Sequence, residues 1–456
     1  MKLKMIAFAV AAAAAAPAFA VVSPAQLTAA VAAGRYIDMT GASATKATVK
    51  TALAAACADA QVSFTANKDR NAYGCTMKAS AAGYPAAWKG QPFVVFHSVS
   101  GGSLTSILGM STNVAQQNTT VRTDFAGCAS TDGGLNYTGC TVEARRSNGG
   151  LSDVEKALFQ DVLDTDPPVG VNLAQIVSKP ALAAQSFGIA ASLPLWYALQ
   201  AQQGLATAAC PAGNFTPACT PTISRTQYAT MVANSNNSNL GGYYGWEVLN
   251  LGAYDTSIHA GVGSTEDMII CRRPVTSGTQ ASSNAYFLNK NCAVAGAGKE
   301  PSADSDDSGR YEVIENAGTS DVKNCLADGS TAGAGRQFRI GVVSSENLPK
   351  ATDNWQWLKL DGVALNTDAA QRASSVEMEY GLVMEMVMHY STDNSITSPD
   401  QRTALDALVA ELGNDSAPKA GIYVVPHGTT YYTGAGSVIG RSTNGGNNCR
   451  SRNEYL

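Results

Sequence analysis

The sequence predicts an α/β protein with two lobes, and three observations lead to this fold class. The chain has 456 residues, which is more than one ordinary hydrophobic core accommodates, so two domains are expected. Several strand-like segments run directly into helical segments through short turns of glycine, serine and threonine. These strands are apolar along their whole length, as is typical of sheets that helices cover on both faces.

Three of these strand-to-helix turns have the same composition. A strand at 36–39 leads into GAS (41–43), the strand FVVFHS leads into SGGS (100–103), and the strand MIIC leads into TSGT (276–279). A helix N-terminus offers unpaired backbone N–H groups and a partial positive charge, while glycine allows close approach and a hydroxyl adds a directed bond. Helix capping explains any one such turn, but three together favour a site for an anion.

The remaining elements are a long strand, its following helix and two insertions. The segment 376–390, VEMEYGLVMEMVMHY, alternates strictly and predicts a strand with one packed face, followed by a helix at 401–412. Glycine-, threonine- and asparagine-rich segments at 126–150 and 208–222 each contain two cysteines and are expected to be surface insertions. A polar loop at 295–309 follows the third turn.

The first twenty residues have the pattern of a secretory signal. They combine two lysines, an alanine-rich apolar run and an A-F-A end, which predicts cleavage after Ala20. The stretch is too short and too alanine-rich to be a convincing membrane span. We therefore expect a periplasmic or secreted protein that is not inserted in a membrane. The net charge of −5 and the charged fraction of 15% argue against a nucleic-acid partner.

Ten cysteines in an exported chain predict five disulfides. Spacing alone does not fix their connectivity, and pairing neighbours in the sequence is the simplest assumption. That assumption gives Cys57–Cys75, Cys128–Cys140, Cys210–Cys219, Cys271–Cys292 and Cys325–Cys449. A structural zinc site is disfavoured, because the sequence has no C-x-x-C pair and its four histidines are scattered.

The motifs taken in order resemble the phosphate-binding proteins of ABC uptake systems, which have the type II periplasmic-binding-protein fold. The resemblance spans most of the chain, and RRPVTSGT is its most specific element. It implies two lobes with a ligand cleft between them, at the carboxyl ends of strands. The motifs that carry it are GAS, SGGS, GLSDVEKALF, ISRTQYATMV, YYGWEVLN, CRRPVTSGTQASSNAYFL, FRIGVVSSEN and WQWLKLDGVALN.

The resemblance also implies site residues from both lobes. Ser277, Gly278 and Thr279 would bind anion oxygens through hydroxyls and backbone N–H groups, and Arg273 would pair with the anion. Asp153 matches the aspartate that accepts the proton of a protonated phosphate, which discriminates against sulfate.

Two further turns would complete this predicted site. Ser100 falls where the second loop donates a hydroxyl, and Ala42 and Ser43 fall in the first loop, which in the family contributes mainly backbone N–H groups. The sequence departs from the family at Val275, where an acidic residue usually pairs with the arginine. Arg272 therefore remains an alternative to Arg273.

Other candidate sites have simpler explanations. His97 lies beside two serines, but no G-x-S-x-G elbow accompanies it, so a hydrolase is a distant third hypothesis. Met384, Met386 and Met388 share one strand face and His389 the other, which favours packing over metal binding. A calcium-loop spacing favours a solvated acidic loop, because flanking helices are not evident. Its residues are Asp304, Asp306, Ser308, Gly309 and Glu315.

The function that follows is an exported solute-binding protein, without enzymatic activity or cofactor, which captures inorganic phosphate or a similar oxyanion. An ABC permease would be its partner. The alternative is an exported structural, adhesive or scavenging protein on the same fold. The expected organisation is a signal peptide at 1–20, a first lobe at 21–185, a second lobe at 186–339 and a return segment of the first lobe at 340–456.

Overall fold

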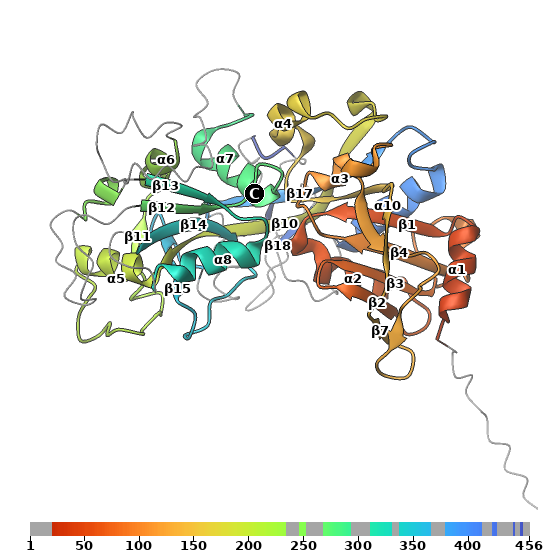
Figure 1. Cartoon of the computed structure of the whole chain (residues 1–456), viewed down its shortest axis with the longest axis horizontal. Helices are drawn as coiled ribbons and strands as arrows, with labels where there is room; N and C mark the ends of the chain where they lie inside the picture. Colours follow the sequence, from red (N-terminus) through yellow and green to blue (C-terminus); the bar gives the residue numbers. More distant parts are fainter. Residues whose placement is uncertain are drawn as a thin grey trace, which may run out of the picture.

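A computed structural model of the chain has two α/β lobes side by side (Figure 1). It describes residues 21–233, 246–251, 268–292, 311–330, 337–365, 379–412, 422–425, 441–442 and 447–449. The predicted signal peptide and the aspartates of the calcium-like loop lie outside the described residues. The predicted α/β class with two lobes is confirmed. No helix among the described residues has the length and apolar character that crossing a membrane requires.

The first lobe is built on a mixed sheet with helices on both sides. Parallel strands β1 (Tyr36–Gly41), β4 (Pro92–Ser98) and β9 (Gly149–Ser152) form its centre, and β2 (Val62–Asn67) and β3 (Arg70–Thr76) continue it in antiparallel fashion. The helices are α1 (Pro24–Ala32), α2 (Lys46–Ala55), α3 (Thr105–Leu108), α4 (Gln160–Thr165) and α10 (Pro399–Leu412). The short helices are η1 (Ser43–Thr45), η2 (Ala86–Trp88), η3 (Val114–Gln116), η4 (Lys156–Phe159) and η5 (Leu173–Gln175).

The predicted insertion after α3 forms small hairpins at the edge of this sheet. Cys128 and Cys140 are joined by a disulfide within it. Arg145 lies near the end of the insertion. Its Nε is 3.4 Å from Oδ2 of the buried Asp38, and its guanidinium lies over the ring of Phe96. These contacts attach the insertion to the core of the first lobe. The insertion contains β6 (Ala129–Ser130), β7 (Asn136–Thr138) and β8 (Val142–Arg145), and β8 pairs with β5 (Asn118–Val121), which precedes the insertion.

The second lobe is built around three parallel strands. Strand β12 (Met268–Arg272) lies between β13 (Tyr311–Glu315) and β14 (Phe338–Ser344), with which it pairs. The helices of this lobe are α5 (Leu193–Gln202), α6 (Arg225–Val232), η7 (Trp246–Leu249), α7 (Gly278–Leu288) and α8 (Thr319–Asp328). Its small strands are β11 (Thr222–Ile223), β15 (Trp355–Trp357) and β16 (Lys359–Leu360).

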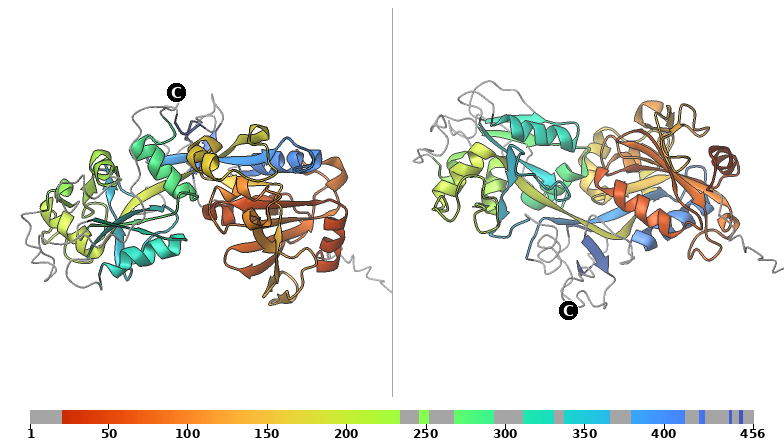
Figure 2. Two further views of the ribbon diagram at one scale, coloured as in Figure 1. Left: turned by 45° about the horizontal axis from the view of Figure 1, so that its top comes forward. Right: turned by 90° about the horizontal axis from the view of Figure 1, so that it is seen from below.

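One long strand, β10 (Ile176–Ser192), runs from the first lobe into the second (Figure 2). Its first part pairs with β17 (Val383–Ser391), which in turn pairs with β9, and its second part pairs with β14 and β15. The two lobes therefore share a continuous sheet in the order β13-β12-β14-β10-β17-β9-β1-β4-β3-β2-β7-β6. Strand β18 (Ile422–Val425) pairs with β10 and with β19 (Arg441–Ser442).

Two sequence-based expectations about this region are wrong. The return to the first lobe was expected at 340, but β14, β15 and β16 all pair with strands of the second lobe, so the return comes with β17. Strand β17 was expected to have one packed face, whereas all nine of its residues are buried. It lies between β10 and β9, and it contacts α3 and α10, so neither of its faces meets water.

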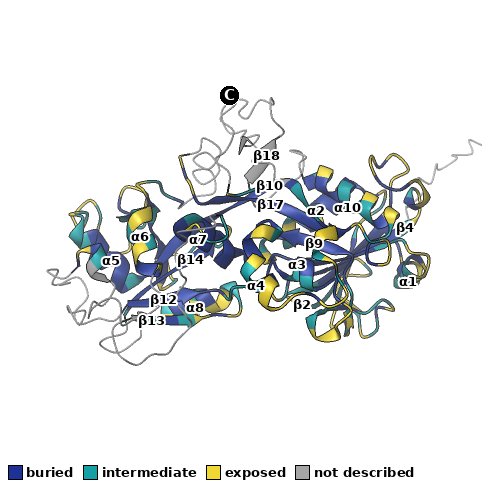
Figure 3. Ribbon diagram, turned by 90° about the horizontal axis from the view of Figure 1, so that it is seen from above, coloured by how far each residue is buried: buried dark blue, intermediate teal, exposed yellow. Residues whose placement is uncertain are grey.

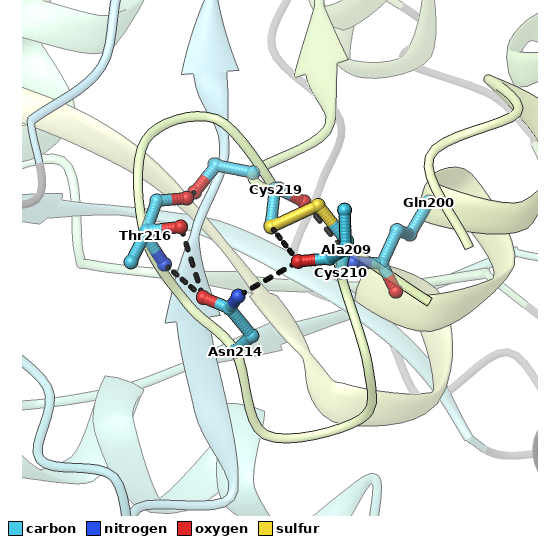
Figure 4. The surroundings of a disulfide bond; sticks show 7 residues. Gln200, Ala209, Cys210, Asn214, Thr216 and Cys219 are labelled. Carbon is cyan, nitrogen blue, oxygen red and sulfur yellow. Dashed lines mark hydrogen bonds between the residues drawn. A yellow bond between two sulfur atoms is a disulfide. The ribbon is translucent and has the colours of Figure 1, made fainter. Parts of the chain in front are cut away.

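Three of the five disulfides join the neighbours that the sequence suggested. These are Cys57–Cys75, Cys128–Cys140 and Cys210–Cys219. The last of them closes the insertion at 208–222, where the Ala209 carbonyl accepts a hydrogen bond of 3.2 Å from Asn214 (Figure 4). Gln200 of α5 donates a bond of 3.1 Å to the Cys219 carbonyl, which ties this loop to the lobe.

The other two expected pairs, Cys271–Cys292 and Cys325–Cys449, are wrong. The structure joins Cys271 to Cys325 and Cys292 to Cys449. Helix α7 separates Cys271 from Cys292, and its 11 residues carry the chain about 16 Å away. Cys325 of α8 instead packs against β12, in the same buried cluster as Cys271.

The segment 447–449 links the lobes. Cys449 is bonded to Cys292, which follows α7 of the second lobe. Asn448 donates two hydrogen bonds of 2.7 Å to the Glu155 carboxylate of the first lobe, and it also exchanges bonds with the Glu385 backbone in β17. A short piece of chain is thus attached covalently to one lobe and by hydrogen bonds to the other.

Candidate functional site

The turns that begin α7 and α3 meet where the two lobes face each other. The Leu104 N–H donates a hydrogen bond of 3.0 Å to the Thr276 carbonyl. A Cβ added to Gly278 would lie 2.2 Å from the Ser103 hydroxyl and 2.4 Å from Oδ2 of Asp153. The start of α7, the glycine–serine turn after β4 and the aspartate after β9 therefore lie together at this junction. Figure 3 shows α7 almost entirely buried beside this junction.

Asp153 is a buried carboxyl group with one oxygen engaged and one free. The Ser103 hydroxyl donates to Oδ2 at 3.0 Å, and the Asp153 N–H donates to that hydroxyl at 3.2 Å. Oδ1 is buried without a hydrogen-bond partner. Burial raises the pKa of Asp153 to about 7, while the bond from Ser103 and the charge of Arg273 lower this pKa and the charge of Glu346 raises it.

Arg273, which follows β12, is also buried and also keeps one unpaired donor. Its Nη1 donates a hydrogen bond of 3.0 Å to the Thr319 hydroxyl at the start of α8. Its Nε is buried without a partner. Burial lowers the pKa of Arg273, and the charges of Asp153, Asp321 and Asp69 oppose this shift. Arg273 is thus a positive group with free hydrogen-bonding capacity that faces acidic groups from both lobes.

Helix α7 begins where the TSGT turn predicted, but its first serine does not cap it. Ser277 is the N-cap residue, in an extended backbone conformation, and its side chain makes no capping hydrogen bond. Its own N–H donates to the Pro274 carbonyl at 2.9 Å. The first N–H groups of a helix have no partner within the helix, so this buried helix start is suited to an anionic group. Because the Ser277 hydroxyl makes no capping bond, helix capping does not account for a serine at this position.

The three predicted residues of the other loops do not join this group. Ala42 donates its N–H to the Leu151 carbonyl at 2.8 Å, so this N–H is already used. Ser43 is exposed at the start of η1, and the Ser100 hydroxyl accepts a bond of 3.3 Å from Arg70. Within the described residues, none of the three is hydrogen-bonded to Asp153, Arg273 or Ser277. Their assignment to the site stays a prediction.

Arg272 is engaged elsewhere, and Val275 leaves Arg273 without an acidic partner in its own loop. Arg272 forms an ion pair of 3.1 Å with Glu315 at the end of β13, which disfavours it as the alternative to Arg273. The structure adds two residues that the sequence reading did not assign, Ser103 and Thr319. Ser103 was visible as the second hydroxyl of SGGS. Thr319 follows Gly318, the N-cap residue of α8, whose N–H donates to the Asp321 carboxylate at 2.8 Å.

The two histidines that the structure describes, His97 and His389, are buried in the core of the protein. His97 is fully buried with Nε2 3.3 Å from the Thr45 hydroxyl, and burial together with Lys46 lowers its pKa to about 3. His389 is equally buried, 2.8 Å from the Ser106 hydroxyl, and its pKa is also lowered to about 3 by burial. In the parts of the chain that the structure describes, no group of three His, Cys, Asp or Glu residues is placed to hold a metal ion.

Comparison with known proteins finds remote structural similarity. No family model and no curated protein sequence matches the chain. A Clostridium perfringens structure, assigned as a phosphate ABC transporter substrate-binding protein with bound phosphate, is 10% identical, with 82% of this chain and 92% of that chain covered and a TM-score of 0.34. A phosphate-binding protein from Stenotrophomonas maltophilia is 14% identical, with 79% and 80% covered and a TM-score of 0.32.

These structures are of the class whose motifs the sequence resembles. Their TM-scores lie below 0.5, and no residue role in this chain follows from them. The roles considered below depend on the contacts at the lobe junction.

Proposed function

We propose that this chain is a solute-binding protein that captures phosphate or a related oxyanion at the junction of its two lobes. The observation that carries the proposal is a pair of unsatisfied buried groups beside the start of α7. Asp153 and Arg273 are only 5% and 6% exposed, and each keeps one polar atom, Oδ1 and Nε, without a partner. Leaving such a group unpaired costs about 1–3 kcal/mol, so a ligand that pairs with both would be strongly favoured.

A protonated oxyanion fits both groups at once. Its oxygens accept hydrogen bonds from Arg273 and from the N–H groups at the start of α7, with Ser277 and Thr279 as further donors. Its proton is donated to the free oxygen of Asp153. Phosphate keeps a proton at neutral pH and sulfate does not, so the carboxylate form of Asp153 would repel sulfate. Inorganic phosphate is therefore the preferred ligand.

The biological role proposed is delivery of this ligand to a membrane permease from the periplasm or the outer surface. No step of this role requires covalent chemistry. The alternative is a structural, adhesive or scavenging protein on the same fold; the five disulfides and the two disulfide-closed insertions suit an exported protein of either role and do not favour it. Phosphate uptake by cells that lack the gene separates the two roles, since only the transport role predicts slower uptake at low phosphate.

Calorimetry on protein stripped of bound anions tests the binding proposal. Phosphate and arsenate are expected to bind, and sulfate to bind far more weakly at about pH 8.5, where Asp153, with a pKa of about 7, is ionised. Arg273→Ala is expected to weaken phosphate binding by roughly 100-fold or more, because it removes a buried charge-assisted bond. Arg272→Ala is the matched control, since the Arg272 side chain pairs with Glu315, and its affinity should stay within a few-fold of the parent.

Two results would count against the proposal. Absence of heat and of any thermal shift with all three oxyanions would refute oxyanion binding. A larger loss of affinity in Arg272→Ala than in Arg273→Ala would show that the wrong arginine has been assigned.

A further inference from the structure

In the described residues, no side chain of the loop that carries Arg273 is hydrogen-bonded to its guanidinium. Between Arg273 and Ser277 the chain has Pro274, Val275 and Thr276. Proline has no N–H and valine has no polar side-chain atom, and the Thr276 carbonyl accepts a hydrogen bond from Leu104 of the first lobe. In the part of the chain that the structure describes, Arg273 makes no hydrogen bond to any side chain of this loop, the Thr276 hydroxyl included.

Helix α8 supplies the acceptor. The Thr319 hydroxyl lies 3.0 Å from Nη1 of Arg273 and is the one hydrogen bond of this side chain within the described residues. The start of α8 is itself held, because the Gly318 N–H donates to the Asp321 carboxylate at 2.8 Å. Thr319 follows Gly318 directly, so this hydrogen bond holds the backbone immediately before Thr319.

One disulfide and one hydrogen bond connect α8 and the segment before it to β12, the strand that precedes Arg273. The disulfide Cys271–Cys325 joins β12 to α8, with 5.9 Å between the Cα atoms. At the other end of the connection, the Asn316 N–H donates to the Arg272 carbonyl at 2.8 Å. In the sequence, Thr319 thus lies between Asn316 and Cys325, which are both bonded to β12. These two bonds restrict the distance between the Thr319 hydroxyl and Arg273.

We infer that Thr319 is the positioning residue of Arg273, and that it sets oxyanion affinity through that arginine; this inference rests on the proposed function. Thr319 binds Nη1 and leaves the buried Nε without a partner, and the charge of Asp153 acts on the same guanidinium. Because a hydroxyl is uncharged, it orients the guanidinium without neutralising it, whereas a contacting carboxylate would do both. The full charge of Arg273 stays available to the ligand.

The test compares Thr319→Val, Thr319→Ser and the parent protein by phosphate calorimetry. Valine keeps the shape and removes the acceptor, so the dissociation constant is expected to rise roughly tenfold, the effect of one lost hydrogen bond to a charged group. Serine keeps the hydroxyl and should restore affinity to within about twofold. Thr51→Val is the matched control, since Thr51 bonds only the Ala47 carbonyl on the exposed side of α2.

A double-mutant cycle with Arg273→Ala distinguishes positioning from a general structural effect. If Thr319 acts through Arg273, adding Thr319→Val to Arg273→Ala should change the dissociation constant by less than about twofold. A further loss as large as in the parent would overturn the inference, as would an unchanged affinity in the single Thr319→Val variant. Thr319→Ala replaces the valine variant if thermal unfolding finds that valine does not fold.

The result also separates this inference from the proposed function. Failure of the unaltered protein to bind any oxyanion would overturn both. Normal phosphate binding that is insensitive to the Thr319 hydroxyl would overturn only the inference and leave the proposed function intact.

Discussion

Asp153 is the residue of the junction whose chemistry depends most on its surroundings. Its pKa is raised to about 7, chiefly by burial, so near neutral pH the side chain changes between a carboxyl group that can donate a hydrogen bond and a carboxylate that can only accept one. The folded pKa lies above the unfolded value. The ligand-free protein therefore binds this proton more tightly than the unfolded chain does, and this contribution to stability decreases as the pH rises from about 4 to about 7.

The same titration predicts pH-dependent anion selectivity. Sulfate has no proton to donate, so it should bind well only when Asp153 is protonated. A group with a pKa of about 7 predicts that sulfate affinity falls roughly 30-fold between about pH 5.5 and about pH 8.5. Phosphate carries a proton across this range and should change much less. Calorimetry with both anions over this pH range measures the difference.

The variant Asp153→Asn is the control for this effect. Asparagine offers a donor at every pH, so its sulfate affinity should be nearly independent of pH and its preference for phosphate should be reduced. A pH dependence like that of the parent would assign the titration to another group.

Helix α7 is held by the first lobe at both ends. Its start contacts Ser103 and Asp153, as described above. Beyond its end, the Lys290 ammonium lies 2.6 Å from the Asp161 carboxylate, and Asn291 donates hydrogen bonds to the Leu158 carbonyl and to Asp161. The helix belongs to the second lobe by its connection to β12, yet its position is determined by both lobes. A change at its first residue should therefore affect the lobe junction.

Gly278→Ala is expected to weaken both stability and phosphate binding. Alanine is normally favoured over glycine in a helix by up to about 1 kcal/mol. Here its Cβ would lie 2.7 Å from the Asp153 Cβ and closer still to two side-chain oxygens, so the junction must open or shift. We expect a loss of roughly 1–3 kcal/mol in the free energy of unfolding and a clear loss of affinity, measured by chemical denaturation and calorimetry.

Gly318→Ala is the comparison for this prediction. It also changes a glycine at a helix start, but the added Cβ would lie 3.1 Å from the end of the Asp321 side chain, which can move. Its loss of stability should be smaller. If Gly278→Ala instead stabilises the protein, the close contact at the junction does not exist in solution.

The start of α7 was predictable from the sequence because its signals are local. The apolar strand, the glycine and the flanking hydroxyls all lie within a few residues. Ser103, Thr319 and the disulfide partner of Cys271 were not assigned, because each is defined by a contact between segments distant in the chain. Asp153 was assigned through a resemblance and lies at the junction. Ser100 was assigned in the same way, but its hydroxyl is bonded to Arg70.

The whole molecule is organised around β10, which belongs to both lobes. Separate lobes joined by flexible linkers would move independently, but here a strand of 17 residues continues from one to the other within the same sheet. The segment 447–449 adds a second connection. The expected boundary at 340 failed for this reason, because strand pairing of 338–360 with β10 and β11 could not be deduced from local patterns.

Removing the Cys292–Cys449 disulfide should destabilise the protein more than removing Cys210–Cys219. The first closes a loop with a sequence separation of 157 and the second one of 9. The chain-entropy model gives contributions of about 5 and about 2.5 kcal/mol respectively. Chemical denaturation of the two double cysteine-to-serine variants compares them. Equal losses would mean that the Asn448 contacts hold the segment 447–449 in place without the covalent bond.

The Cys292–Cys449 pairing also affects the order in which the protein matures. During synthesis Cys271 and Cys292 emerge first, Cys325 follows, and Cys449 comes last, with a sequence separation of 157 from its partner. The two earliest of these thiols are not native partners, so premature oxidation would join them wrongly. Correct maturation therefore requires either that Cys292 stays reduced until Cys449 arrives or that a thiol exchange reaction repairs the early pair. Yield in an oxidising compartment should accordingly depend on disulfide isomerase activity.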